Sequence, residues 1–367
     1  MKNHPSLFVA ATRQNDGKTM MSLGLFYALN ERLKDLGYMK PIGQQYCVVG
    51  DEKVDKDAVL FQKVFNLKDP FTELNPIAVE KGFTRQAILE NNTTSYEQKL
   101  IKSYKKLCKK HPYMLIEGTG HAGVGSVMGL SNARVAELFS SKALLVTMGG
   151  IGRAIDEVML NVALFASQKI PLKGLVFNKV DENRLDQITP SLSRYFDAKK
   201  LKIYGYVPFV PSLIRPTIAG IFEALDYDII CGQKHLLNKV NEVVIGDMAP
   251  HDALSSLSLN TLLIVPANRE GLIMTALLGN LVQNEQKFSL SGIIFTGGKS
   301  PHINVMDLIK KYEIPTIIVH ENSFQVTQKI NKLLIKLRHE ELEKIQMVKE
   351  LVLTHVDIDS IISDYFN

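Results

Sequence analysis

Short apolar runs alternate with longer stretches of helical period along the first 210 residues. Residues 7–11 are all apolar (Leu7-Phe8-Val9-Ala10-Ala11), which predicts a buried strand. A polar loop follows and ends in Gly17-Lys18-Thr19, after which apolar residues recur at helical spacing up to position 36. Because glycine commonly follows the last turn of a helix, we expect this helix to end at Gly37.

Five further apolar segments predict strands at residues 38–43, 113–117, 143–147, 172–179 and 201–207. Helical patterns lie between them at 58–65, 84–90, 96–109, 152–168 and 185–196. This alternation predicts an α/β fold with a doubly wound parallel sheet, whose ligands bind beyond the carboxyl ends of the strands. Residues of several chemical types lie at or near those ends, and we expect them to form one composite site: Lys40, Glu117, Thr147, Asn178 and Pro208.

The second half of the chain repeats the alternation on a smaller scale. Strands are predicted at 242–246, 261–266, 291–296 and 315–320, with helices at 250–257, 269–283, 302–312 and 323–337. We therefore predict a nucleotide-binding α/β domain over 1–215 and a linker over 216–240. A smaller α/β domain over 241–340 and a helical extension over 341–367 follow. We expect the terminal segment, 338–367, to pack on the second domain or on a partner subunit.

The segment that ends in Gly17-Lys18-Thr19 has the layout of a phosphate-binding loop: strand, polar loop, Gly-Lys-Thr, helix. In such a loop the backbone N–H groups hold an oligophosphate, the lysine neutralises it and the threonine hydroxyl ligates Mg²⁺. The usual first glycine is absent, since its place falls on Thr12 or Ala11, but alanine is small enough for the backbone to approach. The alternative is a plain strand–helix turn with an exposed lysine. The loop residues predicted to bind nucleotide are Ala11, Thr12, Asn15, Asp16, Gly17, Lys18 and Thr19.

A second informative strand ends in Glu117 and leads into the glycine-rich segment Gly118-Thr119-Gly120-His121. A carboxylate at the end of a buried strand, beside a phosphate loop, is placed to hold Mg²⁺ or its water. The glycines suggest close approach to a ligand or a mobile lid. A solvated strand end is the alternative interpretation for Glu117. By contrast, Gly297-Gly298-Lys299-Ser300 lacks the upstream glycine spacing, and we expect a plain turn there.

The composition of the chain limits the kinds of ligand and cellular location that we expect. Apolar residues make up 46% and the net charge is +5, without a concentrated basic tract, which suits small anionic ligands and does not indicate nucleic acid. The three cysteines, Cys47, Cys108 and Cys231, have no paired or metal-type spacing, as expected of reduced thiols. No apolar run approaches the roughly 18 residues that span a bilayer, and we expect no signal peptide ahead of the first strand. We expect a cytoplasmic protein that binds no membrane.

Five motifs in order resemble those of dethiobiotin synthetases: Ala11-Thr12 with Gly17-Lys18-Thr19, Lys40-Pro41-Ile42, Asp57-Ala58, Glu117-Gly118-Thr119-Gly120 and Phe177-Asn178-Lys179. Residues 1–215 also resemble the related ATPase at the N-terminus of some phosphotransacetylases and in cobyrinic acid a,c-diamide synthases. The resemblance implies a P-loop NTPase domain that uses ATP and Mg²⁺ and forms a homodimer. It also implies that Lys18 and Thr19 hold phosphates and metal, that Asp57 and Glu117 are further metal ligands, and that Lys40 faces the transferred group. Asn178 would recognise the adenine edge.

The chain departs from that family at positions that matter for the second substrate. Ala11 stands where the family has glycine, Gln44 and Gln45 occupy a region of small hydroxyl residues, and His121 replaces a glycine. Residues predicted to meet a small carboxylate or amine substrate are Gln44, Gly118, Thr119, Gly120 and His121. The second half resembles the regulatory domain named for an Asp-Arg-Thr-Gly-Gly motif, although these five residues do not occur in succession. Nothing in the 367 residues resembles an acetyltransferase domain, so we expect no phosphate acetyltransferase activity.

Two functions remain open. One is an ATP-dependent ligase in which Lys18 and Lys40 are catalytic, and the retained Thr19, Asp57 and Glu117 favour it. The other is a nucleotide sensor with weak ATPase activity, whose second domain binds a metabolite or partner. The departures at Ala11, Gln44 and His121 and the regulatory-type domain favour this sensor, which is the function that we expect.

Overall fold

The computed structural model describes residues 4–80, 82–90, 93–281, 288–333 and 336–367, and the chain divides into two compact units. The first unit contains Met1–Val210 together with Leu337–Asn367, and the second contains Pro211–Lys336. The chain therefore leaves the first unit after Val210 and re-enters it at Leu337. The second unit is an insertion in the first.

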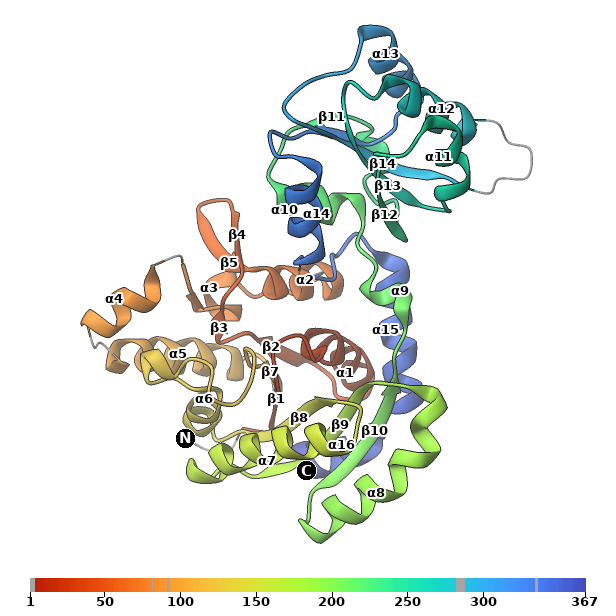
Figure 1. Cartoon of the computed structure of the whole chain (residues 1–367). Helices are drawn as coiled ribbons and strands as arrows, with labels where there is room; N and C mark the ends of the chain where they lie inside the picture. The colour runs from red at the N-terminus through yellow and green to blue at the C-terminus, as the bar shows by residue number, and fades with distance from the viewer. Residues whose placement is uncertain (1–3, 81, 91–92, 282–287, 334–335) are drawn as a thin grey trace. The chain divides into compact units, whose positions relative to one another are not determined.

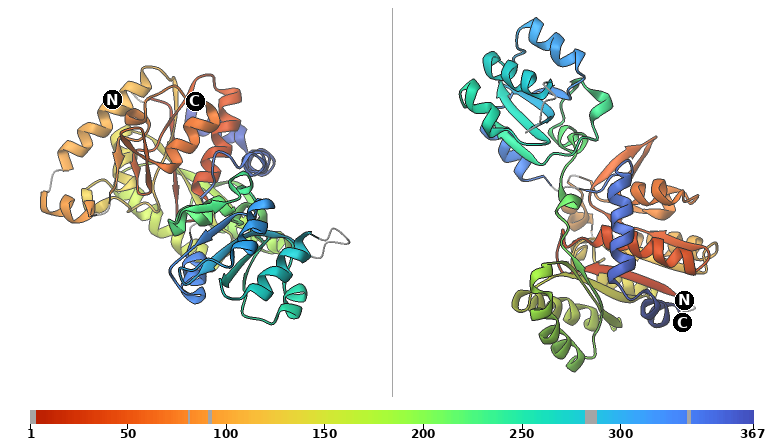
Figure 2. Two further views of the ribbon diagram at one scale, coloured as in Figure 1. Left: turned by 90° about the horizontal axis from the view of Figure 1, so that it is seen from above. Right: turned by 90° about the vertical axis from the view of Figure 1, so that its right-hand side faces the viewer.

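The first unit is built on a six-stranded sheet in the order β10-β9-β8-β1-β7-β2, shown in Figures 1 and 2. Every pair of neighbours is parallel. All six residues of the central strand are buried, as its apolar sequence predicts. The doubly wound parallel sheet is confirmed. Its strands are β1 (Ser6–Ala11), β2 (Leu36–Met39), β7 (Tyr113–Glu117), β8 (Lys142–Met148), β9 (Leu172–Val180) and β10 (Lys202–Pro208).

Helices cover this sheet, and two small strand pairs project beyond it. The pairs are β3 (Ile42–Gly43) with β6 (Ile77–Ala78), and the hairpin of β4 (Tyr46–Val49) and β5 (Glu52–Asp55). Across the residues described above, no helix combines the length and apolarity that a membrane crossing requires. The helices are α1 (Lys18–Arg32), α2 (Lys56–Phe65), α3 (Phe71–Leu74), α4 (Phe83–Glu90), α5 (Thr93–Cys108), α6 (Asn132–Phe139), α7 (Gly152–Ser167) and α8 (Leu185–Ala198).

Gly37 does not end the first helix, so that prediction was wrong. The helix α1 stops at Arg32, and Gly37 lies within β2, paired with Met114 of β7. A Cβ atom at Gly37 would approach the Met114 sulfur to 2.5 Å and the His111 ring to 2.8 Å. Glycine is present here because the strand and the neighbouring side chains pack too closely for any other residue.

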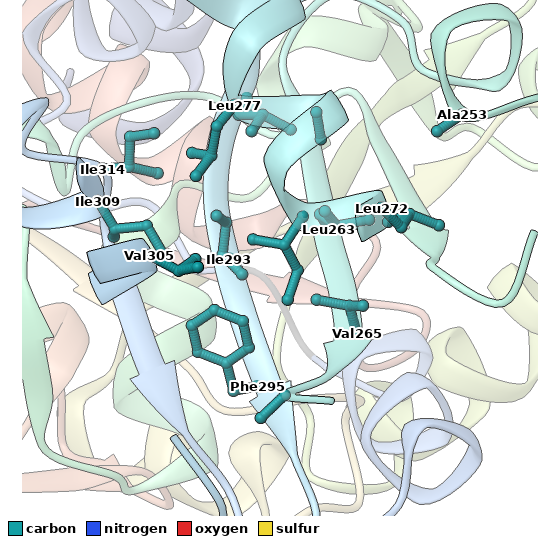
Figure 3. Close-up of a cluster of buried hydrophobic side chains, with 14 of the residues drawn as sticks. Ala253, Leu263, Val265, Leu272, Leu277, Ile293, Phe295, Val305, Ile309 and Ile314 are labelled. Carbon is teal, nitrogen blue, oxygen red and sulfur yellow. The ribbon is translucent and has the colours of Figure 1, made fainter. Parts of the chain in front are cut away.

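The second unit holds a five-stranded sheet in the order β11-β15-β14-β13-β12. Four strands are parallel, and β11 pairs with β15 in the antiparallel sense. Figure 3 shows the core on one face, where side chains of β13 and β14 meet those of α12 and α13. The strands are β11 (Ile229–Cys231), β12 (Glu242–Ile245), β13 (Thr261–Pro266), β14 (Leu290–Thr296) and β15 (Thr316–Ile318). The helices are α9 (Pro211–Ile214), α10 (Ile218–Leu225), α11 (Pro250–Ser256), α12 (Glu270–Leu281), α13 (Ile303–Lys311) and α14 (Ser323–Asn331).

The segment expected as a linker, 216–240, is part of this second unit, since it contains α10 and the edge strand β11. The apolar residues of α10 explain why, because Ile218, Ile221 and Phe222 are buried in the second core. The parts of the predicted helices that cover 282–283 and 334–335 lie outside the described residues. Gly297 and Gly298 form a bend after β14, in which both residues have a left-handed φ and donate their N–H groups to the carbonyls of Glu321 (3.0 Å) and Val319 (2.8 Å).

The C-terminal segment packs on the first unit, which corrects the expectation that it packs on the second domain. Its helices are α15 (Leu342–His355) and α16 (Ile358–Phe366), and α15 lies along α1. A Cβ at Gly24 of α1 would come within 2.3 Å of the Val352 side chain, so this glycine lets the two helices approach. Gly205 forms a bridge with Val356, and the Tyr365 hydroxyl donates to the Ala143 carbonyl at 2.9 Å.

Candidate functional site

The loop between β1 and α1 carries the Gly-Lys-Thr sequence, and Lys18 and Thr19 form the first turn of α1. Gly17 precedes the helix with φ of 89°, and Asn15 also has a left-handed φ of 71°. A Cβ at Gly17 would come within 2.1 Å of the Asn178 amide nitrogen, so glycine is required on steric as well as conformational grounds. The N-terminus of a helix at the end of a buried strand offers unpaired N–H groups to an anion.

Ala11 and Thr12 occupy the positions where the first glycine of the loop would fall, and the backbone there still pairs with the neighbouring strand. The Thr12 N–H donates to the Val146 carbonyl at 2.9 Å, which continues the pairing of β1 with β8. Asp16 then closes the loop, because its Oδ2 accepts from the Thr12 hydroxyl at 2.5 Å and from the Arg13 N–H at 2.8 Å. Asp16 is buried, and burial raises the pKa of its carboxyl above the usual value.

Lys40 lies between β2 and β3 and is the centre of a buried charge cluster. Its Nζ is 2.8 Å from Asp57 Oδ2 and 2.7 Å from Glu117 Oε1, and it also donates to the Gly118 carbonyl at 3.3 Å. The three charged residues are 2%, 6% and 0% exposed, respectively. Burial alone would lower the pKa of Lys40, but the carboxylates of Asp57 and Glu117 outweigh it and raise that pKa.

The predicted metal ligands meet at the same place. Thr19 Oγ1 donates to Glu117 Oε1 at 2.9 Å, the same oxygen that accepts from Lys40. Hydroxyl and carboxylate oxygens are the ligands that Mg²⁺ takes in proteins, usually together with water and substrate phosphates. Thr19, Asp57 and Glu117 therefore supply oxygen atoms of the kind that Mg²⁺ binds, beside the phosphate-binding loop.

Two residues that position this cluster were missed by the sequence analysis. The Asn75 side chain donates to the Lys40 carbonyl at 2.8 Å and accepts from the Asp55 N–H at 2.9 Å. Asp55 in turn begins α2, since its side chain accepts from the Asp57 N–H at 2.9 Å. Asn75 and Asp55 are 4% and 1% exposed. The signal was available at Asp55, which precedes a helical pattern as an N-cap residue does.

Asn178 and Lys179, at the end of β9, contact the phosphate-binding loop itself. Asn178 Nδ2 donates to the Asp16 carbonyl at 2.8 Å, and Lys179 Nζ donates to the Asn15 carbonyl at 2.7 Å. Pro208 ends the neighbouring strand β10 and is half-buried. The next residue, Phe209, donates its N–H to the Val180 carbonyl at 2.8 Å. Asn178 and Pro208, both predicted to bind the nucleotide, thus belong to adjacent strands on the β9 side of the loop.

The glycine-rich segment after Glu117 is held by Asn132, a further residue that the sequence analysis missed. Its side chain accepts from the Thr119 N–H at 3.0 Å and donates to the carbonyls of Thr119 and His121, both at 2.7 Å. The Thr119 hydroxyl donates to the Ile42 carbonyl, which ties this segment to the one that carries Gln44. Gly118 and Gly120 are buried, whereas the side chains of Gln44 and His121 are exposed. The structure brings Gly118 to Lys40 but shows no contact of Gln44 or His121 with the charge cluster among the described residues.

Comparison with known proteins identifies both parts of the chain. Residues 5–217 match the AAA domain family, and residues 220–333 match the DRTGG domain. A phosphate acetyltransferase from Nitratidesulfovibrio vulgaris is 24% identical over 371 residues, which cover 99% of this chain and 52% of that protein. The ATP-dependent dethiobiotin synthetase BioD from Nitrosopumilus maritimus is 24% identical over 220 residues, covering 59% of this chain and 95% of that protein.

The MinD cell division protein from Aquifex aeolicus is a structural relative with 14% identity and a TM-score of 0.37, covering 57% of this chain and 84% of that one. The chain spans about half the length of the phosphate acetyltransferases that it matches.

Proposed function

Because the chain belongs to the AAA domain family, we propose that it binds a nucleoside triphosphate with Mg²⁺ at the loop before α1, hydrolyses it slowly, and responds through its DRTGG domain to a metabolite or partner. ATP is the nucleotide that the sequence resemblance implies. The observation that carries the proposal is the convergence of Thr19, Lys40, Asp57 and Glu117 beside the loop.

Each residue of the site has a distinct part in this proposal. Lys18 and the N–H groups of the first turn of α1 hold the phosphates. Thr19, Asp57 and Glu117 would hold Mg²⁺, which when bound neutralises charge on the phosphates. Lys40 supplies a second cation for the terminal phosphoryl group. In the structure its ammonium is shared between two carboxylates and a carbonyl, so it is held in place before a nucleotide binds.

The residues predicted to meet a second substrate favour the sensor over a biosynthetic enzyme. Gln44 and His121 are exposed and stand where dethiobiotin synthetases carry other residue types. The DRTGG domain is inserted within the nucleotide-binding unit, so a ligand on one unit has two chain connections through which to affect the other.

An ATP-dependent ligase that acts on a small carboxylate or amine is the second candidate. The specific observation in its favour is the intact buried cluster of Lys40, Asp57 and Glu117, the set that ligase chemistry needs to stabilise a transferred phosphoryl group. The dethiobiotin synthetase among the relatives is consistent with this alternative.

Replacing Lys18 with alanine is expected to weaken binding of the Mg²⁺–nucleotide by about 3 kcal/mol, because the phosphates lose a close positive charge. Isothermal titration of the wild type and the variant measures the loss. The unfolding temperature without nucleotide should not fall, since Lys18 lies on the first turn of α1 outside the apolar core. Equal affinities in the two proteins would refute the phosphate-binding loop.

Turnover separates the sensor from the ligase. We expect nucleotide hydrolysis far below the enzyme median of about 10 s⁻¹, with no acceleration by 7,8-diaminononanoate or other diamino acids. We also expect a homodimer in sedimentation experiments. A burst of nucleoside diphosphate that depends on the acceptor, and that disappears in Lys40→Ala, would support the ligase and reject the sensor.

A further inference from the structure

Asp16 is a buried acidic residue inside the phosphate-binding loop, and the proposed function makes no use of its charge. The residue is 2% exposed. Both hydrogen bonds of its side chain go to one oxygen, Oδ2, which accepts from the Thr12 hydroxyl at 2.5 Å and from the Arg13 N–H at 2.8 Å. The carboxylate thus lies within the segment between β1 and α1, which is the segment proposed to enclose the phosphates.

Charged side chains from the loop, from α7 and from β9 surround Asp16. Arg13 Nε is 3.9 Å from Asp16 Oδ1 but 2.7 Å from Glu157 Oε2, so the cation lies closer to the carboxylate of α7. Glu157 itself adds negative charge near Asp16. Lys179 of β9 directs its ammonium to the Asn15 carbonyl at 2.7 Å. In the described part of the chain, hydrogen bonds from two neutral groups, rather than a cation in direct contact, therefore hold the Asp16 carboxylate.

The negative charge of Asp16 is poorly solvated where it lies. Burial raises the pKa of its carboxyl, and Glu157 adds to this rise, whereas the two hydrogen bonds and the Arg13 cation oppose it. An oligophosphate held by the N–H groups at the start of α1 would bring further negative charge to the same loop. Like charges that share a poorly solvated site repel each other strongly, and protonation of the carboxyl group relieves that repulsion.

We propose that the Asp16 carboxylate opposes the phosphates of the bound nucleotide, so that the nucleotide binds more tightly to the protein in which Asp16 is protonated. Binding then takes up a proton at this residue, and the affinity of the loop increases as the pH falls. The direction follows from linkage, because a ligand that prefers the protonated form and the proton favour each other's binding. This inference rests on the proposed nucleotide site and concerns how that site is regulated.

Asp16→Asn removes the charge and keeps the loop braced. The asparagine Oδ1 can take the place of the aspartate Oδ2 and accept from both donors, because an amide oxygen has two lone pairs. Asp16→Ser is the second variant, since it also removes the charge and its hydroxyl oxygen can accept a hydrogen bond. Asp156→Asn is the matched control. It removes one negative charge from an exposed position of α7, where solvent and salt screen it.

Isothermal titration with Mg²⁺ and a non-hydrolysable ATP analogue tests the role of Asp16. At neutral pH, Asp16→Asn and Asp16→Ser should bind the analogue about 10-fold more tightly than the wild type, because the phosphates no longer meet a like charge. The difference should shrink as the pH is lowered, since the wild type itself becomes protonated. Comparison of the proteins at each pH cancels protonation of the analogue's own phosphates. Titrations in buffers of different ionisation enthalpy should show more proton uptake by the wild type than by Asp16→Asn.

Asp156→Asn should match the wild type in affinity and in proton uptake. A cooperative unfolding transition without nucleotide shows that each variant is folded. If both Asp16 variants bind the analogue no more tightly than the wild type, or if their advantage is the same at every pH, the proposed role of Asp16 is overturned and the nucleotide site stands. Failure of the wild type and of both variants to bind the analogue would overturn the nucleotide site as well.

Discussion

Replacing Lys40 with methionine is expected to lower the free energy of unfolding by about 3–5 kcal/mol, the usual cost of removing one partner from a buried ion pair. Methionine keeps most of the volume of the side chain but leaves Asp57 and Glu117 without the ammonium between them. Chemical denaturation at neutral pH measures the loss. Mg²⁺ should raise the unfolding temperature of the variant more than that of the wild type, because the carboxylates lose the cation that competes with the metal.

Lys110→Met is the matched control. Lys110 also pairs with two carboxylates, Asp69 and Glu73, each at 2.9 Å, but its side chain is 48% exposed. Solvent screening limits such pairs to about 0–1 kcal/mol. If the two variants lose the same small amount of stability, water screens the charges around Lys40 in solution. The assignment of this cluster as a water-excluded site for phosphoryl transfer would then be wrong.

Ending the chain after Lys336 is expected to unfold the first unit and abolish nucleotide binding, while the second unit stays folded. The deleted segment buries eight apolar side chains, each worth about 1.5–3 kcal/mol, and their sum of roughly 12–24 kcal/mol is at least comparable to the 5–15 kcal/mol that holds a typical domain together. Hydrogen exchange resolved along the chain would show lost protection in β1 and α1 and retained protection in β13 and β14. The eight are Ile345, Val348, Val352, Val356, Ile358, Ile361, Tyr365 and Phe366.

Two point substitutions test the same contact without truncation. Val352→Ala removes the side chain that packs against Gly24 and should cost about 2 kcal/mol. Leu353→Ala, at the adjacent and 42% exposed position, should change stability by less than about 0.5 kcal/mol. Full protection of β1 and α1 in the truncated chain would show that the first unit is complete without its C-terminal helices.

Much of the fold follows from hydrophobic periodicity, because a strand buried on both faces and an amphipathic helix have patterns that do not depend on what they pack against. This holds for β1, β7, β8 and β9, and for the loop before α1. Prediction from periodicity fails at β11, because its three residues are too few to show any period. The segment around them was therefore predicted as a linker. Prediction from periodicity fails again at α15, since an apolar stripe specifies that a helix is buried but not against which partner.

The site was predictable where one residue carries the chemistry and not where several share a hydrogen-bond network. Lys40 and Glu117 could be found from their positions at strand ends, whereas Asp57 was found only through the motifs that resemble dethiobiotin synthetases. Asn75 lies between two turn signals in an irregular connection, where asparagine is ordinary, and only the fold shows that its side chain holds the Lys40 carbonyl. The contact of Asn178 with the loop was likewise hidden, because it joins segments more than 160 residues apart in sequence.

The insertion of the second unit between Val210 and Leu337 also sets an order on biosynthesis. A ribosome adds about 5–20 residues per second, so it needs on the order of 10–30 s to extend the chain from the end of β10 to the last residues of α16. During that interval the nascent first unit lacks the helices that cover α1 and β10, whereas all of the second unit emerges before them. We therefore expect the inserted unit to reach its native state first, and the nucleotide-binding unit to remain incomplete until α15 and α16 emerge.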